Sequence, residues 1–351
     1  MPYEKLVQCL LPVQCARSKP ATDKDEVLFK VAVVPVESGK GESEQAIPLQ
    51  HTITLPGFAL VVSMNHTLGD GQTYYKLYGM LSTDSEVDEL DPVRVSGFEE
   101  AKTEIIGLKE TAMLKSAGIA FGILGTYIGT KLSRRAPQNI CIHEVDPVWV
   151  AKEKANAKQE GLAPFVSTND ALSSWFFRKM GSNTNIMLAN FRSRRPSVLN
   201  LSDCHVGNYE ANLPYFPGDV ETPALIRRSI RDADGAFRAR RAGVPTTEIP
   251  SFWTLLQNKT AIITNWASFY REVNLLDNAR DNKESTIKPK LHLPIMESDG
   301  IITSVWNNAI IFRPRAGELG MLMITRRFDS DMLTQIKEQD GPDAPLGKRI
   351  V

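Results

Sequence analysis

The chain has 351 residues, of which 42% are hydrophobic and 23% are charged. This composition is typical of a globular protein, and the length predicts two lobes because domains run to about 100–200 residues. Forty-one Lys and Arg residues balance 41 Asp and Glu residues, so we expect no nucleic-acid partner: a bulk nucleic-acid binder needs excess positive charge to displace counterions.

Cysteine spacing and the N-terminus set expectations about metals and compartment. The four cysteines form no CxxC pair, which argues against a zinc ribbon, a disulfide scaffold and any bound metal. They are Cys9, Cys15, Cys141 and Cys204. Glu4 and Lys5 stand where a secretory signal would need an apolar segment. We therefore expect a reduced, cytoplasmic protein.

The first 81 residues predict strands followed by a helix. β-Branched runs at 27–36 and 51–55 predict strands. The stretch 58–64 is apolar on both faces, which is typical of a strand covered by helices on both sides. The following helix is predicted by apolar residues at helical spacing, namely Tyr74, Leu77, Tyr78 and Leu81. His66 therefore falls in a loop between a strand and a helix, where open α/β sheets bind ligands.

The stretch 82–136 differs from its surroundings. Its segment 116–130 carries no charge over 15 residues, whereas a membrane-spanning helix needs about 20. Four glycines spaced 4, 3 and 4 apart, beginning at Gly118, would form a small-residue ridge on a helix. Two interpretations stay open: a covered linker helix, and an interfacial or re-entrant membrane contact.

The remaining chain interleaves strands and helices, which indicates an α/β or α+β fold. The predicted strands cover residues 139–145, 185–190, 260–270, 301–312 and 320–325. A helix should begin at Ser167 as N-cap, with Asp170 three residues on. Further helices are predicted over 222–242, which is basic, and 332–338.

The pattern His66-x-x-x-Asp70-Gly71 carries the clearest chemistry. A histidine of pKa about 6.5 can accept a proton from a hydroxyl or an amine near neutral pH. Gly69 and Gly71 would let the loop adopt backbone angles that other residues avoid. Asp70 could orient the histidine or pair with an arginine. A purely structural alternative stays open, in which His66 is hydrogen-bonded at a strand end and Asp70 caps the next helix.

Further motifs follow in a fixed order, and the chain resembles the BAHD acyltransferases of the chloramphenicol-acetyltransferase-like superfamily. The matching segments are residues 54–60 leading into 65–71, the helix start at 166–175, the strand end at 190–196, the pair Gly207-Asn208, the strand residues 264–266 and the closing stretch 320–332. The resemblance spans most of the chain, and it implies two similar lobes of mixed sheet with covering helices and an active-site channel between them.

The resemblance also implies a domain layout. Residues 1–81 would form a shortened N-terminal lobe, 82–138 a crossover linker containing the segment 116–130, and 139–351 a C-terminal lobe. The strand 260–270 would return to the N-terminal lobe. Compared with the family, fewer residues precede the histidine motif, and the DFGWG block is absent after the strand at 264–266.

The resemblance assigns roles to individual residues around the histidine. His66 would be the general base. Asp70 would face away from the substrate and pair with Arg192 or, as second choice, Arg194, and together with Gly71 these residues would support the site. A buried carboxylate held in this way is costly to unpair.

Other roles concern the substrates. Thr264 and Trp266, two apart on a strand and so on one face, would stabilise an oxyanion, and Asn208 would line the pocket. The implied reaction moves an acyl group from acyl-CoA, a co-substrate rather than a bound cofactor, to a hydroxyl or amine of a small molecule or lipid. A monomer is expected. Two alternatives stay open: a membrane-directed version of the same chemistry that uses 116–130, and a non-catalytic binding module.

Overall fold

The computed structural model describes residues 3–15, 27–35, 57–132, 140–192, 201–230, 249–275, 287–296, 301–326, 336 and 343–350. Its helices are α1 (Tyr3–Leu10), η1 (Leu11–Val13), α2 (Gly71–Gly79), α3 (Phe98–Ile106), α4 (Leu108–Leu114), α5 (Ala117–Leu132), α6 (Pro147–Glu160), α7 (Thr168–Met180), η2 (Pro217–Asp219), α8 (Pro223–Ile230), α9 (Phe252–Leu256) and α10 (Ile301–Val305). Its strands are β1 (Phe29–Pro35), β2 (Phe58–Met64), β3 (Ile140–Val145), β4 (Thr184–Asn190), β5 (Glu210–Tyr215), β6 (Thr260–Asn265), β7 (Asn307–Phe312), β8 (Gly320–Ile324) and β9 (Leu346–Arg349).

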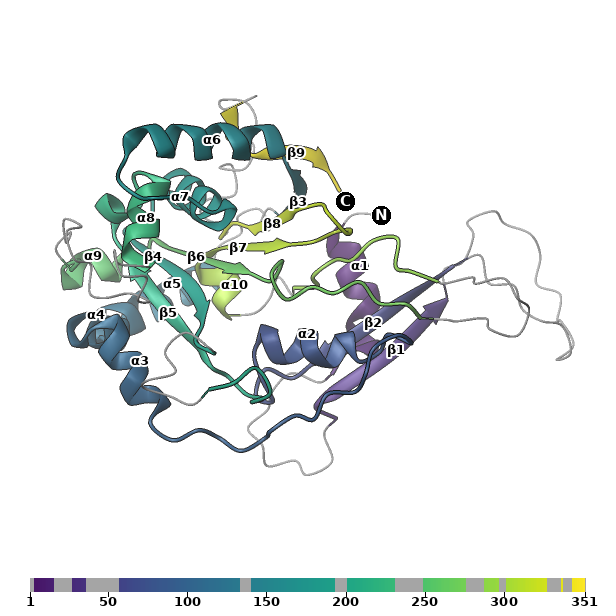
Figure 1. Ribbon diagram of the computed structural model, residues 1–351. Coiled ribbons are helices and arrows are strands. Elements are labelled where there is room, and N and C mark those ends of the chain that lie inside the picture. Colours follow the sequence, from purple (N-terminus) through teal and green to yellow (C-terminus); the bar gives the residue numbers. More distant parts are fainter. Residues whose placement is uncertain are drawn as a thin grey trace, which may run out of the picture.

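Among the described residues, the strands form one large mixed sheet and one two-stranded ribbon (Figure 1). The large sheet has the order β5-β4-β6-β7-β8-β3-β9. Strands β4, β6 and β7 run parallel, and the other pairs are antiparallel. The fold is therefore mixed α/β, as expected, but the expectation of two similar sheets is wrong for the described part of the chain.

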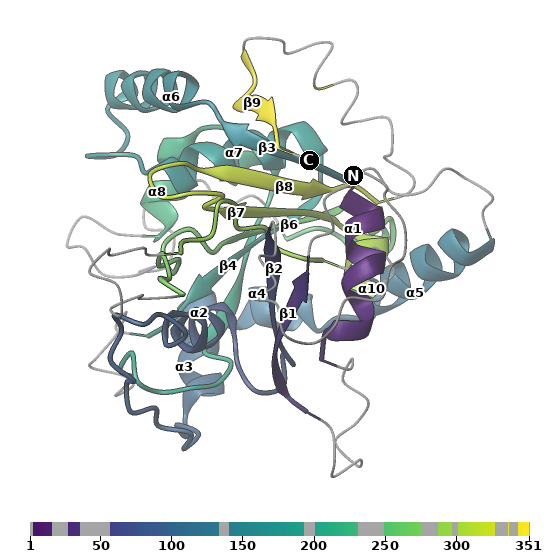
Figure 2. The same cartoon turned by 90° about the vertical axis from the view of Figure 1, so that its right-hand side faces the viewer.

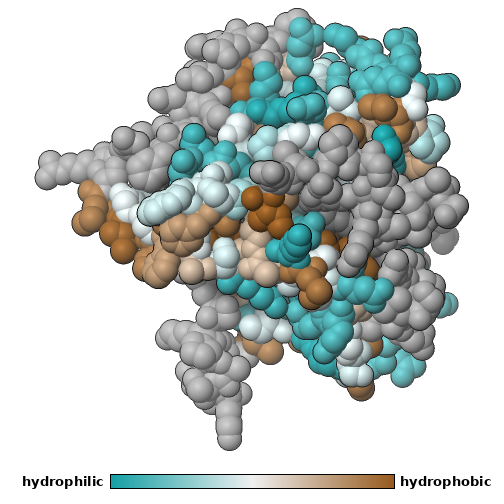
Figure 3. Space-filling view, turned by 90° about the vertical axis from the view of Figure 1, so that its left-hand side faces the viewer, coloured by the Kyte–Doolittle hydropathy of each residue, from teal (hydrophilic) through white to brown (hydrophobic). Residues whose placement is uncertain are grey.

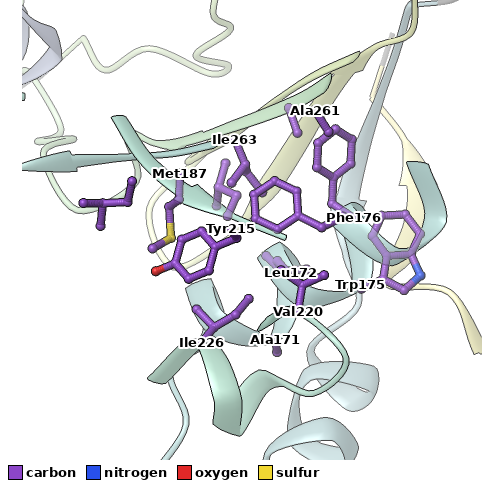
Figure 4. Packing of buried hydrophobic residues seen from close by; sticks show 14 of the residues in the cluster. Ala171, Leu172, Trp175, Phe176, Met187, Tyr215, Val220, Ile226, Ala261 and Ile263 are labelled. Atoms are coloured by element: carbon purple, nitrogen blue, oxygen red, sulfur yellow. The ribbon is translucent and has the colours of Figure 1, made fainter. Parts of the chain in front are cut away.

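Side chains of the central strands point alternately to the two faces of the large sheet and so form two layers of core. On β7 and β8, Ala309, Ile311, Met321 and Met323 belong to the cluster that contains α7, and the residues between them belong to a second cluster on the opposite face. This is the period of two that any strand imposes on its side chains. Figure 4 shows Leu172 and Phe176 of α7 directed at β6 residues such as Ile263.

Helix α7 forms where its sequence signals place it. The Ser167 side chain accepts a hydrogen bond from the Asp170 amide, and the Asp170 carboxylate accepts one in return from the Ser167 amide, which makes a capping box. Gly181 ends the helix with a left-handed φ of 54°. Between these two caps, most residues of the helix are buried against the sheet.

Helix α1 covers the opposite face of the large sheet (Figure 2). Tyr3 and Val7 pack among Ile142, Ile310 and Phe312. The Tyr3 hydroxyl donates to the Pro294 carbonyl at 2.9 Å. The described residues before position 82 are therefore divided between the ribbon and the large sheet.

Three strand predictions need correction. Residues 58–64 do form β2, but among the described residues they pair with β1 alone and are half-buried, with Val62 packed against the cluster formed by Tyr75 and Tyr78 of α2. Of the strand predicted at 260–270, residues 260–265 form β6 and pair with β4 and β7 in the large sheet, while the residues after them pack in a cluster with Tyr75 and Tyr78 of α2. The run 301–312 is split into α10 and β7.

Other predictions fall partly or wholly outside the described residues. The helix predicted over 222–242 begins as α8 at Pro223 and is described as far as Ile230. The strand predicted at 51–55 lies outside the described residues, and of the helix predicted at 332–338 only Ile336 is described.

The uncharged segment 116–130 forms most of α5, and its glycine ridge allows a close helix contact. A Cβ on Gly122 would lie 2.8 Å from the Leu255 carbonyl oxygen, and a Cβ on Gly118 would lie 3.1 Å from the Leu255 Cβ. Gly125 faces open space, with nothing within 4 Å. The glycines at 118 and 122 thus allow α5 to pack closely against α9.

A pair of glycine substitutions tests this contact. We expect Gly122→Ala to lower the urea midpoint of unfolding, because its methyl group meets a backbone carbonyl and overpacking of this kind costs about 1–3 kcal/mol. Gly125→Ala is the matched control and should raise the midpoint, since alanine is favoured over glycine in a helix by about 1 kcal/mol. Equal shifts for the two variants would contradict the packing of α5 on α9.

Candidate functional site

His66 lies in the loop that follows β2, and its imidazole reaches residues of the large sheet. Its side chain is 71% exposed. Nδ1 lies 3.2 Å from the Asn208 side-chain oxygen, and Nε2 lies 3.8 Å from a carboxylate oxygen of Glu210. The candidate base is therefore accessible to a substrate and is flanked by two polar side chains of the segment 208–210.

The hydrogen bonds of Asn208 determine which imidazole nitrogen carries the proton. The Asn208 amide nitrogen donates to the backbone carbonyl of His66 at 2.8 Å. This bond fixes the orientation of the amide, so the oxygen that faces Nδ1 can only accept. In the neutral ring the proton consequently sits on Nδ1, and Nε2, the nitrogen near Glu210, holds the free electron pair.

Asp70 forms a buried ion pair with Arg192, the first of the two arginines considered from the sequence. The two side chains are 3% and 1% exposed, and Arg192 Nη1 lies 2.7 Å from Asp70 Oδ2. The same carboxylate accepts from the backbone amides of Thr73 and Tyr209, at 3.1 and 2.9 Å. Asp70 is thus both the N-cap of α2 and a partner of the large sheet.

Arg192 completes the connection between the two parts of the chain. Its guanidinium donates to the carbonyls of His205 and Gly207 at 2.9 Å each, and it lies 5.0 Å from the centre of the Tyr209 ring. The Asp70 amide also donates to the Gly207 carbonyl at 3.1 Å. These bonds hold the His66 loop against the segment that carries Asn208 and Glu210. Arg194, the second candidate, lies outside the described residues.

Of the two glycines of the motif, Gly69 is required for space, and neither is required for an unusual backbone angle. Neither Gly69 nor Gly71 has a left-handed φ, so the expectation about backbone angles is wrong. A Cβ on Gly69 would lie 2.6 Å from the Thr73 side chain, and one on Gly71 would lie 3.4 Å from Trp266 Nε1. Gly71 therefore brings the start of α2 close to the indole of Trp266.

Thr264 and Trp266 line a small hollow at the end of β6. Gly71, Asn190 and Glu210 line the same hollow. Trp266 also packs at an edge-to-face angle of 64° on Tyr75 of α2. The structure thus brings the two residues expected to hold an oxyanion together with Glu210, whose carboxylate also faces His66.

A second, larger cavity lies on the other side of the segment 208–210. It has a volume of about 310 Å³, and its lining includes Arg94, Phe98, Asn208 and Tyr209. Asn208, expected to line a substrate pocket, belongs to this cavity, whereas Glu210 belongs to the hollow at β6. His66 contacts one residue from the lining of each concave surface, Asn208 through Nδ1 and Glu210 through Nε2.

Glu210 is the site residue that sequence reasoning missed. No local pattern in the sequence marks it, because its role depends on the approach of the His66 loop to the start of β5. Burial raises the pKa of the Glu210 carboxyl above its ordinary value, and the nearby Asp70 adds to this, while His66 and Arg192 oppose it. Its charge is therefore sensitive to what occupies the hollow.

The other described histidines have structural partners. His143 Nδ1 lies 3.0 Å from the Gly347 carbonyl, and His205 Nδ1 lies 2.8 Å from the Ser202 hydroxyl. His292 packs among the aromatic rings of α2, of Tyr270 and of Phe312 at the end of β7. Within the described residues, no group of three or more His, Cys, Asp or Glu side chains could hold a metal ion.

Searches of protein-family models and of curated proteins give no match. Among solved structures, vinorine synthase superposes with a TM-score of 0.50 at 12% identity, over 95% of this chain and 70% of that chain. F. sporotrichioides TRI101 complexed with coenzyme A and T-2 gives a TM-score of 0.45 at 14% identity, over 84% and 68%. The first condensation domain of the CDA synthetase gives 0.37 at 11% identity, over 85% and 68%.

The similarity to vinorine synthase shows a shared fold. At 12% identity it does not transfer an activity or a residue's role to this chain.

The buried ion pair can be tested by removing one charge. Asp70→Asn leaves Arg192 buried without its counter-charge, so we expect the free energy of unfolding to fall by about 3–5 kcal/mol. Asp88→Asn is the matched control, because Asp88 is 52% exposed and lies 3.6 Å from Lys76. Exposed pairs contribute about 0–1 kcal/mol. Chemical unfolding of both variants measures the difference, and equal losses would contradict the role given to Asp70.

His292 predicts a pH dependence of stability. Burial lowers its pKa below the ordinary value of 6.5, so the unfolded chain binds this proton at a higher pH than the folded chain does. The free energy of unfolding should therefore decrease as the pH falls below about 6.5. In His292→Phe the free energy of unfolding should fall less steeply between pH 7 and 5. A measurement at pH 8 gives the effect of the substitution on packing alone. An unchanged slope would contradict the assignment.

Proposed function

We propose that the protein is an acyltransferase that moves an acyl group from a thioester to a hydroxyl or an amine. The observation that carries the proposal is the position of His66, an exposed ring with a defined tautomer that contacts Asn208 from the lining of one concave surface and Glu210 from the lining of the other. The shared fold with vinorine synthase and the ordered sequence motifs support it.

His66 Nε2 is the proposed general base. The free electron pair of Nε2 takes the proton of the acceptor as the acceptor oxygen or nitrogen attacks the thioester carbonyl. The bond from Nδ1 to Asn208 holds the ring in the required orientation. When the tetrahedral intermediate collapses, the same proton can pass to the leaving thiolate, so the imidazole is regenerated.

Glu210 is the proposed partner of the protonated ring. At 3.8 Å from Nε2, its carboxylate favours the imidazolium that forms during the reaction, because opposite charges attract strongly at this distance in a partly buried site. The proton balance of the step remains that of a single histidine, since Glu210 acts through its charge.

Thr264 and Trp266 are the proposed donors to the oxyanion. Both line the hollow that also contains Glu210, and a hydroxyl and an indole N–H are suitable hydrogen-bond donors. Removing one such donor typically slows the reaction about 10²–10³-fold. Gly71 supports this role by its position at the start of α2, where a Cβ would be in van der Waals contact with the indole nitrogen at 3.4 Å.

Acyl-CoA is the donor class that the sequence resemblance implies, and the acceptor is proposed only as a small-molecule or lipid alcohol or amine. Asn208, from the lining of the cavity, and Glu210, from the lining of the hollow, contact different nitrogens of the His66 ring. Two substrates could therefore meet at the imidazole from different sides.

Thioester turnover tests the proposal. The purified protein is incubated with acetyl-CoA and longer acyl-CoAs and a panel of alcohols and amines, and the release of free thiol is followed. We expect His66→Ala to lose about 10²–10⁴-fold of the rate, the usual contribution of a positioned general base. Glu210→Gln should lose less, because it keeps the shape of the site.

Glu318→Gln provides the matched control, since Glu318 is an exposed carboxylate paired with Arg315 on the surface. It should retain the wild-type rate. Absence of turnover by the wild type with every acceptor, or full activity of His66→Ala, would overturn the catalytic proposal and favour a binding module.

A further inference from the structure

Helix α5 exposes its large apolar side chains and buries its small ones. The exposed fractions are 57% for Phe121, 52% for Leu124, 47% for Ile128 and 79% for Leu132. These positions are three or four residues apart and therefore lie on one face of the helix. Figure 3 shows the apolar side chains gathered along the protruding flank of the molecule, at the left of the view.

This arrangement reverses the usual pattern of a helix on a protein surface. Such a helix normally turns its apolar stripe to the core and its charged face to water. In α5 the buried face consists of residues such as Gly118, Gly122 and Thr130, and the exposed face has no charge between Ala117 and Lys131. The apolar face is thus presented outward as a contiguous surface, which marks an interaction site.

Two aromatic residues of α9 extend this surface. Trp253 is 73% exposed and Phe252 is 46% exposed, and α9 packs directly on the glycine ridge of α5. Tryptophan is the side chain most enriched where a protein meets the headgroup region of a bilayer.

The charges around α5 indicate what covers it. The sequence has no acidic residue between Glu110 and Glu144, although Lys115, Lys131, Arg134 and Arg135 fall in this interval. Lys115 and Lys131 are exposed at the two ends of α5. An apolar face bounded at both ends by cations complements an anionic lipid surface. The lysine ammonium groups would lie at the level of the lipid phosphates, and the apolar side chains would lie deeper, among the acyl chains.

The helix is placed to lie along a bilayer and not to cross it. Residues 108–132 are long and apolar enough to span a membrane by length and composition, but α4 and α5 are separate helices that meet at 115–116. The 16 residues of α5 extend about 24 Å, less than the roughly 30 Å of a hydrocarbon core. One side of α5 is also occupied by its contact with α9.

We propose that the exposed face of α5, together with Phe252 and Trp253, docks the protein on the surface of an anionic lipid bilayer. The docking depends on apolar insertion of Phe121, Leu124 and Ile128 and on attraction between the flanking cations and the lipid phosphates. It is independent of acyl transfer at His66, so the two proposals can fail separately.

Vesicle flotation of the full-length protein tests the docking. The wild type should float with vesicles of phosphatidylcholine and phosphatidylserine, and less with phosphatidylcholine alone, and the binding should weaken as salt screens the charges. The triple variant Phe121→Ser, Leu124→Ser, Ile128→Ser should bind on the order of 100-fold more weakly, because apolar burial supplies most of the binding free energy of an interfacial helix.

A matched triple variant changes exposed apolar residues elsewhere: Val87→Ser, Val93→Ser and Val148→Ser. These side chains are 77%, 69% and 74% exposed, and the variant should float as the wild type does. Circular dichroism establishes that both variants are folded. Failure of the wild type to float, or equal flotation of the α5 variant, would overturn the proposal.

Light scattering without vesicles tests the main alternative, in which a second copy of the chain covers the exposed face of α5. We expect a monomeric wild type at micromolar concentration. A wild-type dimer that dissociates in the α5 variant would show that a second copy of the chain covers this face, and it would also overturn the lipid assignment.

Discussion

The buried ion pair between Asp70 and Arg192 joins the two parts of the site. Asp70 belongs to the loop after the two-stranded ribbon, and Arg192 follows β4 of the large sheet. Because both charges are withdrawn from water, the pair persists only with its full set of hydrogen bonds, which the Thr73 and Tyr209 amides and the Gly207 carbonyl help to supply. These hydrogen bonds hold the His66 loop, and therefore determine where His66 lies relative to the large sheet.

Much of this arrangement could be predicted from the sequence because it depends on local patterns. The spacing of His66, Asp70 and Gly71 placed a loop before a helix, and Asp70 does cap α2. The capping box at Ser167 and Asp170 forms as expected. The pairing of Asp70 with Arg192 came from the family resemblance, since nothing local to either residue indicates a partner 122 positions away.

The predictions that needed correction concern long-range pairing. An apolar run such as 58–64 shows that a segment can be a strand, but its partners depend on the rest of the sheet, and within the described part of the chain β2 pairs with β1 alone. For the same reason the sequence does not show that 260–265, within the strand predicted at 260–270, pairs with β4 and β7. Glu210 was missed because its role depends on an approach of the His66 loop that the strand's own sequence does not encode.

Hydrogen exchange at individual amides tests most directly whether the ion pair holds the His66 loop. In Arg192→Met, exchange should become faster on the order of 100-fold or more at 67–73 and 205–209, because an orphaned carboxylate destabilises the hydrogen bonds of both segments. Amides of β7, at the centre of the large sheet, should keep their wild-type protection. Uniform acceleration over the whole chain, or unchanged exchange at 67–73, would contradict the account.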